Sequence, residues 1–432
     1  MKKILIIGGG LAGLSAAINL IEEGYKIEII EASPKLGGRT YSFLSNDKHT
    51  IIDNGQHILM GCYSHTLDYI DRVNSRDKFH FQESLEINYV AEEGKTFKLS
   101  IPKSFYPFNL LYGFINFKLL TVSERKTVLK FFLAIKTGNV KVVENQSVKE
   151  LLSIHGQSGG VIGKFWDNLV ISAMNTPIEL ASGELFVNMI KIIFFSGRDG
   201  SNIIIPNVGL SEALIYPAEN LIINKGNKIV TSERVIKVEF QNGKVKEVIT
   251  TKRKITDFEY IISAIPSDQL LKILSNDISA KMNIPSLQYS SILSVNLWLS
   301  ENPLKEKFYG IVGGEFHWLF NKGKYISLVK SAAADLIFSK KNELIETANS
   351  ELKKYFTILT DTEIIDSKII KERKATMISD INSIKKRKKL SYSYNNLFIA
   401  GDWTNTGLPG TIESSVKSGR MISEMILSQP NR

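Results

Sequence analysis

The feature that constrains this chain most is a run of glycines between an apolar strand and a helix. Residues 4–7 (ILII) have the short apolar pattern of a buried parallel strand, and residues 8–13 (GGGLAG) follow directly. Residues 11–23 then place apolar side chains at helical spacing, and Gly24 is suited to end that helix. Residues 27–30 (IEII) predict a second strand. The chain therefore opens as a βαβ unit, which predicts an α/β fold.

The G-x-G-x-x-G spacing in this position is typical of a dinucleotide-binding turn. Gly8 permits the tight turn, Gly10 lets the backbone approach a pyrophosphate, and Gly13 allows the helix to pack closely on the strand. The free amides at the helix N-terminus then face the phosphates, together with the positive end of the helix dipole. Glu31 ends the second strand, where its carboxylate can accept from the adenosine ribose and disfavours a 2′-phosphate.

The glycine turn alone is compatible with NAD or FAD, and the residues after Glu31 favour FAD. Residues 36–39 (LGGR) add two glycines and a guanidinium whose fork of donors suits phosphate oxygens. With Glu31 they resemble the E-x5-G-G-R continuation of the FAD-dependent amine oxidase and phytoene desaturase superfamily. The resemblance implies FAD as the cofactor, with Arg39 at its phosphates.

The end of the chain supplies the other half of this resemblance. Residues 398–402 (FIAGD) predict a strand, a glycine turn and an acid, and the matching aspartate of the superfamily holds the ribityl–phosphate region. Thr411 can cap a helix whose first amides face the flavin pyrimidine edge. Val235 matches the position whose backbone meets adenine. The predicted FAD-binding residues are Gly8, Gly10, Leu11, Ala12, Gly13, Glu31, Ala32, Gly38, Arg39, Gly55, Gln56, His57, Val235, Gly401, Asp402, Thr411 and Ile412.

A narrower resemblance concerns residues 53–61 (DNGQHILMG). Together with Trp166, residues 174–177 (MNTP) and residues 401–404 (GDWT), they resemble the squalene-associated desaturase-like branch, the hydroxysqualene dehydroxylases. The resemblance covers essentially the whole chain, with departures at Met174, where leucine is expected, and at Asn405, where a basic residue often stands. It implies reductive removal of the hydroxyl group of hydroxysqualene, which gives squalene.

That reaction needs a proton donor at the hydroxyl oxygen and a hydride from flavin N5. Asp53 and His57 are the ionisable residues nearest the predicted flavin edge, and we single them out as candidate catalytic groups. His57 titrates near neutrality and suits the role of the acid. Each has a structural alternative, since His57 could hydrogen-bond within the flavin pocket and Asp53 could accept from backbone amides. The other histidines show no metal-ligand spacing.

Cofactor-binding segments at the start, middle and end of the chain predict a discontinuous domain. We expect a Rossmann-like FAD-binding domain over 1–80, 200–270 and 390–432, and an inserted α+β substrate-binding domain over 81–199 and 271–389. The expected elements are strands at 85–90, 96–101, 235–240, 245–251, 260–266, within 282–330 and at 395–400, and helices within 105–135 and 160–196 and at 340–357 and 411–428.

Two segments raise the question of a membrane. The aromatic helices expected within 105–135 could line a tunnel for a long apolar isoprenoid and touch the bilayer, or they could simply form domain core. The net charge of +10 and the run Lys385–Lys389 could meet anionic lipid, although such a run is more often a solvated loop. Recognition modules for nucleic acid are absent from the sequence, so no such partner is expected. The single cysteine, Cys62, favours the reducing cytoplasm, with the inner face of its membrane as a possible location.

Three alternatives to the dehydroxylase stay open at this point. A carotenoid or phytoene-type desaturase would run the flavin in the opposite direction, and an amine oxidase is disfavoured by the missing aromatic-cage and lysine signatures. A non-catalytic isoprenoid carrier of the same fold is disfavoured by intact Glu31, Arg39 and Asp402. One dinucleotide fingerprint is present, so no NAD(P)H site is predicted and the electron donor is left unassigned.

Overall fold

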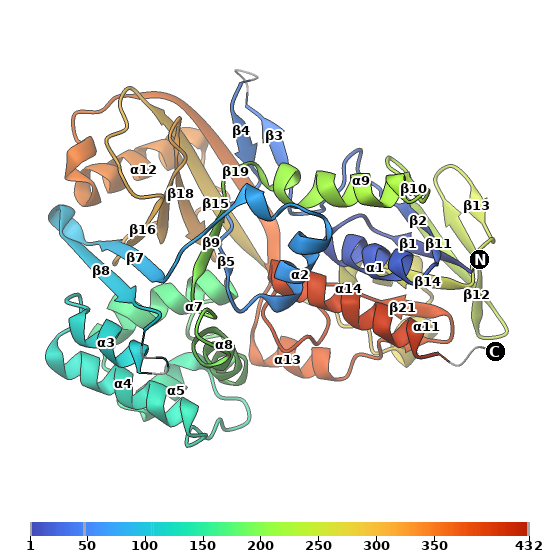
Figure 1. Ribbon diagram of the computed structural model, residues 1–432, viewed down its shortest axis with the longest axis horizontal. Helices are drawn as coiled ribbons and strands as arrows, with labels where there is room; N and C mark the ends of the chain where they lie inside the picture. Colours follow the sequence, from blue (N-terminus) through green and yellow to red (C-terminus); the bar gives the residue numbers. More distant parts are fainter. Residues whose placement is uncertain (1, 46–48, 105, 107, 430–432) are drawn as a thin grey trace.

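The computed structural model describes residues 2–45, 49–104, 106 and 108–429, which form two lobes lying side by side (Figure 1). One lobe is built on a six-stranded sheet in the order β10-β2-β1-β14-β21-β20, in which β20 alone runs antiparallel to its neighbour. Its strands lie within the ranges 1–80, 200–270 and 390–432, and they are β1 (Lys3–Ile7), β2 (Lys26–Ile30), β10 (Lys228–Val230), β14 (Tyr260–Ser263), β20 (Ser393–Tyr394) and β21 (Leu397–Ile399).

Both faces of this sheet are covered. Ile4 and Ile6 share a buried cluster with the helices of one face, whereas Leu5 and Ile7 pack on the other face against a three-stranded sheet. Successive side chains of a strand point to opposite faces, so covering both faces requires the uniformly apolar sequence of β1. The covering elements are α1 (Leu11–Glu22), α9 (Tyr216–Asn224) and α14 (Ile412–Leu427) on one side, and β11 (Val235–Gln241), β12 (Lys244–Thr250) and β13 (Lys254–Ile255) on the other.

The second lobe is built on a seven-stranded sheet in the order β19-β15-β18-β17-β16-β7-β8. Helices α3, α4, α5, α7 and α8 share a buried cluster with β7 and β8, and α12 (Lys341–Tyr355) packs against β15 and β18. The strands are β7 (Leu85–Val90), β8 (Thr96–Ile101), β15 (Tyr289–Leu299), β16 (Phe308–Ile311), β17 (Trp318–Asn321), β18 (Ile326–Ser331) and β19 (Ile364–Met377), and the helices are α3 (Asn109–Asn116), α4 (Val122–Lys136), α5 (Val148–Ile154), α7 (Asp167–Met174) and α8 (Gly183–Phe195).

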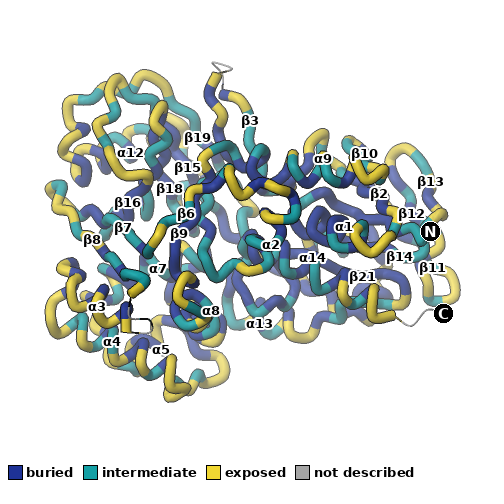
Figure 2. The backbone as a smooth tube through the Cα atoms, viewed as in Figure 1, coloured by how far each residue is buried: buried dark blue, intermediate teal, exposed yellow. Residues whose placement is uncertain are grey.

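Strand β9 (Ile203–Pro206) ties the two lobes together. It pairs with β5 (Leu59–Met60) and β6 (Phe79–Phe81) in a small sheet between the lobes. Ile203 and Ile205 enter the buried cluster that the second lobe forms between β7, β8 and helices α3 to α8, while Ile204 enters the buried cluster beside α1 in the first lobe. Because neighbouring side chains alternate across a strand, one short strand contributes to both cores. Figure 2 shows the buried residues in the middle of each lobe.

Most of the expected elements are confirmed to within a residue or two. The opening strand, helix and strand correspond to β1, α1 and β2, and Gly24 has the positive φ of +82° that suits a residue ending a helix. The hairpin strands correspond to β11 and β12, and Asn242 and Gly243 both have positive φ in the turn between them. The strand expected over 260–266 ends earlier, at Ser263, because Pro266 begins α10 (Ser267–Ile273).

A run of charged residues usually forms a solvated loop, but the basic run 385–389 does not. It forms the end of helix α13 (Ile381–Lys388), and Arg387 inside it is only 1% exposed. The Arg387 guanidinium donates to the carbonyl oxygens of Thr404 and Leu408, while Lys388 pairs with Glu184 at 2.7 Å. The fully buried arginine therefore holds the segment that leads to α14.

Candidate functional site

The glycine turn has the geometry that a dinucleotide site requires. Gly8 has a φ of +108°, and a Cβ on Gly13 would lie 2.1 Å from the carbonyl oxygen of Gly8, so both positions need glycine. A Cβ on Gly10 would meet no atom within 4 Å. Helix α1 begins at Leu11 and Ala12 without a side-chain cap, which leaves its first amides free to donate. This open cradle at a helix N-terminus fits the pyrophosphate of a dinucleotide.

The segment after β2 folds over this turn. The Glu31 carboxylate accepts from the backbone N–H groups of Gly9 at 2.7 Å and Ser33 at 2.8 Å. Ala32 is the residue between Glu31 and Ser33 in this turn. The N–H of Gly37 donates to the carbonyl oxygen of Gly9, which brings Gly38 against Gly10. Glu233 donates its N–H to the carbonyl oxygen of Glu31, so the chain leading into β11, which starts at Val235, passes beside the predicted ribose position.

Arg39 and Asp402, separated by 363 positions in the sequence, meet at the boundary between the lobes. Arg39 Nη2 donates to Asp402 Oδ1 at 2.7 Å, and its Nη1 donates to the carbonyl oxygen of Ala375 on β19 at 2.8 Å. The Gly401 N–H donates to Ser418 Oγ on α14, and Gly401 has a φ of +150°. Two groups predicted to hold the phosphates and the ribityl chain therefore lie next to each other.

Helix α14 points its N-terminus at the same place. The Thr411 hydroxyl accepts from the N–H of Ser414, as an N-cap does, and Ile412 is the first helical residue. Glu413 is buried and accepts from the N–H and hydroxyl of Thr66, so its charge is turned away into the protein. The positive end of the α14 dipole faces the space beside Asp402, where it favours developing negative charge.

The loop that contains residues 53–57 forms the opposite wall. The amide of Gln56 is buried, and among the described residues neither its oxygen nor its nitrogen makes a hydrogen bond of standard geometry, although the Tyr325 hydroxyl lies within reach of it. His57 Nδ1 donates to the carbonyl oxygen of Gly55 at 2.9 Å, which leaves Nε2 as the free ring nitrogen. Burial lowers the pKa of His57 below its usual 6.5. An unpaired buried amide costs free energy, so Gln56 fits a bound polar group.

Asp53 is fully engaged by the protein. Its Oδ1 accepts from the Ser42 hydroxyl at 2.7 Å and from the N–H of Leu210 at 2.8 Å, and its Oδ2 lies 3.8 Å from Lys322 Nζ. The side chain is buried, and these contacts fix the start of the 53–57 loop. The geometry is that of a positioning residue and matches the structural alternative considered for Asp53.

A pocket of about 310 Å³ connects these groups to the second lobe. One wall carries residues predicted to bind the cofactor, among them Arg39, Gln56, His57, Asp402, Thr411 and Ile412. The other wall is largely apolar and carries Leu85, Ile87, Leu99, Phe165, Phe194 and Ile203. Such a pocket suits an apolar ligand whose reacting end reaches the cofactor site.

Sequence reasoning missed several polar side chains of this pocket. Glu372 on β19 lines it and accepts from Asn54 Nδ2 at 3.1 Å. Thr376, further along the same strand, lines the pocket as well. Asn168 and Ser172 line it from α7. Strand β19 was not expected at all, since its sequence (IIDSKIIKERKATM) is strongly charged, so no signal pointed to Glu372.

A glycine cradle at a helix N-terminus and a largely apolar pocket are features expected of a dinucleotide-dependent oxidoreductase. The sequence pattern of the family described as flavin containing amine oxidoreductase matches residues 11–427. The chain therefore belongs to this family and is an FAD-dependent oxidoreductase, which confirms FAD as the cofactor. The residues described above fit that group, because Gly10 leaves room for its phosphates and Gln56 offers an unpaired amide.

Individual relatives are similar to the chain over nearly its whole length. The chain is 24% identical to a hydroxysqualene dehydroxylase of Zymomonas mobilis over 426 residues, covering 98% of each chain. It is 23% identical to a chloroplastic/chromoplastic 15-cis-phytoene desaturase of Arabidopsis thaliana, covering 98% of this chain and 80% of the relative. In fold it is similar to a putrescine oxidase variant with redesigned cofactor binding, with a TM-score of 0.76, 14% identity and 99% of each chain covered. The expected Rossmann-like α/β fold and the resemblance to hydroxysqualene dehydroxylases are confirmed.

Proposed function

We propose that this protein removes the hydroxyl group of hydroxysqualene reductively and releases squalene. The observation that carries the proposal is the pocket, which is lined both by apolar side chains of the second lobe and by His57 and Gln56. The full-length similarity to proteins named hydroxysqualene dehydroxylase supports the same substrate. A long isoprenoid gains free energy from every apolar group that it buries in such a pocket.

FAD, when bound, supplies the hydride that replaces the hydroxyl group. Residues of the glycine turn, with Glu31 and Arg39, would hold its adenosine and phosphate part, and Asp402 would hold the ribityl–phosphate region. The N-terminus of α14 at Thr411 would stabilise negative charge at the pyrimidine edge. Together these groups fix one end of the reaction site on rigid elements of the cofactor lobe.

His57 is the candidate proton donor to the departing hydroxyl. Its Nδ1 is occupied by the carbonyl oxygen of Gly55, so a proton can be given only from Nε2, and only by the imidazolium form. Burial lowers the pKa of His57 below 6.5, so this form is already the minority at pH 6.5 and becomes scarcer as the pH rises further. Asp53 acts on His57 indirectly, by fixing the 53–57 loop through Leu210 and Ser42.

A redox comparison distinguishes this function from that of a desaturase. Reduced holoprotein should convert hydroxysqualene to squalene, whereas oxidised holoprotein given phytoene should stay oxidised. Reduction of the flavin by phytoene, without turnover of the alcohol, would support a desaturase instead. Purified protein that is colourless and stays colourless after addition of FAD would support an isoprenoid carrier.

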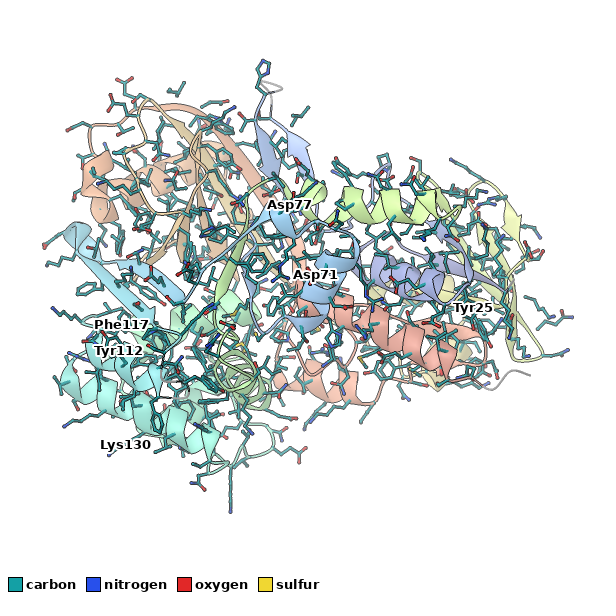
Figure 3. The ribbon with its side chains drawn as sticks, in the orientation of Figure 1. Tyr25, Asp71, Asp77, Tyr112, Phe117 and Lys130 are labelled. Atoms are coloured by element: carbon teal, nitrogen blue, oxygen red, sulfur yellow. The ribbon has the colours of Figure 1, made fainter. Side chains whose placement is uncertain are left out.

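We also propose that α3 contacts the membrane that holds the substrate. Phe108 at its N-cap and the helical residues Leu111, Tyr112 and Ile115 are 46–70% exposed and recur at the spacing of one helix face. Exposed lysines of the same lobe, among them Lys130, favour an anionic surface (Figure 3 labels Tyr112 and Lys130). Among the described residues, no helix is long and apolar enough to cross a bilayer.

Co-sedimentation with vesicles containing anionic phospholipid tests this contact. The double substitution Leu111→Ser and Ile115→Ser should reduce the bound fraction several-fold. The control is Ile236→Ser, which removes an exposed apolar side chain from β11 in the other lobe. Equal binding of both variants would contradict the proposal.

A further inference from the structure

Helix α7 and its C-terminal end bring polar side chains to the part of the pocket that lies in the largely apolar second lobe. Asn168 and Ser172 lie one turn apart on α7, Asn175 is its C-cap residue, and all three line the pocket. Opposite them lies Trp318 of β17, which also lines it. A polar stripe of this kind costs desolvation free energy if the pocket holds only hydrocarbon.

Asn175 is engaged by the protein and marks the end of the stripe nearest the cofactor site. Its Nδ2 donates to the Thr376 hydroxyl at 3.0 Å, and its Oδ1 accepts from the N–H of Ala332 at 2.7 Å. Thr376 lies next to Ala375, whose carbonyl oxygen accepts from Arg39. Ser172 therefore lies about one helical turn before Asn175, whose partner Thr376 is next to the residue that accepts from Arg39.

Asn168 and Ser172 retain hydrogen-bonding capacity. Asn168 is 7% exposed, and its Nδ2 donates to the carbonyl oxygens of Ile311 and His317, but its Oδ1 is buried without a partner. Ser172 Oγ accepts from Trp318 Nε1, which leaves its own hydroxyl proton to donate. One vacant acceptor and one available donor thus stand one turn apart on a single helix face.

We propose that Asn168 Oδ1 and Ser172 Oγ recognise the hydroxyl group of an isoprenoid alcohol. A hydroxyl group is both donor and acceptor, so it can donate to Asn168 while it accepts from Ser172. A hydrocarbon of the same length leaves both groups unsatisfied. The pair therefore selects the alcohol over the hydrocarbon product, an inference that rests on the proposed function of the same pocket.

Equilibrium binding to oxidised holoprotein tests this selection without requiring turnover. Hydroxysqualene and squalene are titrated separately, and binding is followed by the flavin absorbance and by tryptophan emission. Ser172→Ala should weaken binding of hydroxysqualene about three- to tenfold, the worth of one neutral hydrogen bond, and leave squalene unchanged. Ser172→Thr keeps the hydroxyl and should restore the affinity. The control is Ser153→Ala, whose hydroxyl donates to Lys149 on α5 outside the pocket.

Three results would overturn the inference. If Ser172→Ala loses the same affinity for the alcohol and for the hydrocarbon, the substitution acts through packing. If it loses affinity for neither ligand, Ser172 makes no hydrogen bond to the substrate. Binding of hydroxysqualene to Ser172→Thr that is as weak as binding to Ser172→Ala would contradict it as well. Failure of the proposed function gives a different outcome, namely no squalene from reduced protein, whatever the affinities are.

Discussion

Replacing Gly10 by alanine should separate FAD binding from folding. Gly10 has φ of −78° and ψ of 177°, which alanine adopts readily, and an added Cβ would contact no protein atom within 4 Å. The methyl group would instead occupy the space through which the pyrophosphate approaches the first amides of α1. The variant is therefore expected to fold and to bind FAD poorly.

The expected magnitudes follow from these contacts. Alanine is a poorer N-cap than glycine, so the apoprotein should lose about 1 kcal/mol of unfolding free energy or less. A phosphate pushed away from α1 loses at least one charge-assisted hydrogen bond, worth about 1.5–3 kcal/mol, so FAD should bind roughly ten- to a hundredfold more weakly. Gly13→Ala should behave in the opposite way, because its Cβ would lie 2.1 Å from the carbonyl oxygen of Gly8 and must disrupt β1–α1 packing.

Two measurements on the same preparations separate the effect of the substitution on folding from its effect on FAD binding. Denaturant unfolding of the apoprotein gives the stability, and a titration of FAD followed by flavin fluorescence gives the dissociation constant. Gly159→Ala is the matched control, since a Cβ there also meets no atom within 4 Å, but the position lies on α6 (Gly159–Val161), far from α1 in the sequence. The reasoning is refuted if Gly10→Ala binds FAD as tightly as the unmodified protein does.

Three further predictions follow from single side chains. If His57 donates the proton, kcat/KM for hydroxysqualene should fall about tenfold per pH unit above a pKa that burial holds below 6.5, and His57→Gln should remove this limb; an unchanged profile in the variant would exclude the role. Burial alone would raise the pKa of Glu28, but hydrogen bonds from Arg253, Lys3 and Lys228 lower it to about 2, so the group stabilises the fold above pH 4.5 and this contribution, at most about 3 kcal/mol, is lost as the pH falls toward 2. Glu28→Gln should flatten that part of the stability–pH curve, and an equally steep curve would contradict the assignment. Arg387→Met should cost about 3 kcal/mol in denaturant unfolding because two buried carbonyl oxygens lose their donor, whereas Lys388→Ala should cost less than about 1 kcal/mol.

The cofactor half of the molecule was predictable because its constraints are local. The turn over residues 8–13 needs glycine for steric reasons that any sequence must obey, and the apolar strand beside it is required by burial on both faces. The partnership of Arg39 with Asp402 spans most of the chain, and only the resemblance to a flavoprotein superfamily placed the two residues in one site.

The substrate half was predictable only in outline. Strand β19 pairs with β15 alone, at the edge of its sheet, so most of its residues are incompletely buried and its sequence lacks the alternation that marks a strand. Glu372 and Thr376 were missed with it. The structural role of Arg387 was not predicted, because the sequence of a basic run does not show which of several neighbouring cations points inward and donates to carbonyl oxygens.

An anaerobic single turnover tests the central claim most directly. Pre-reduced holoprotein is mixed with hydroxysqualene, and the squalene formed is counted against the oxidised flavin that appears. The account predicts one squalene for each flavin reoxidised. Flavin that stays reduced in the presence of the alcohol, with no squalene formed, would contradict it.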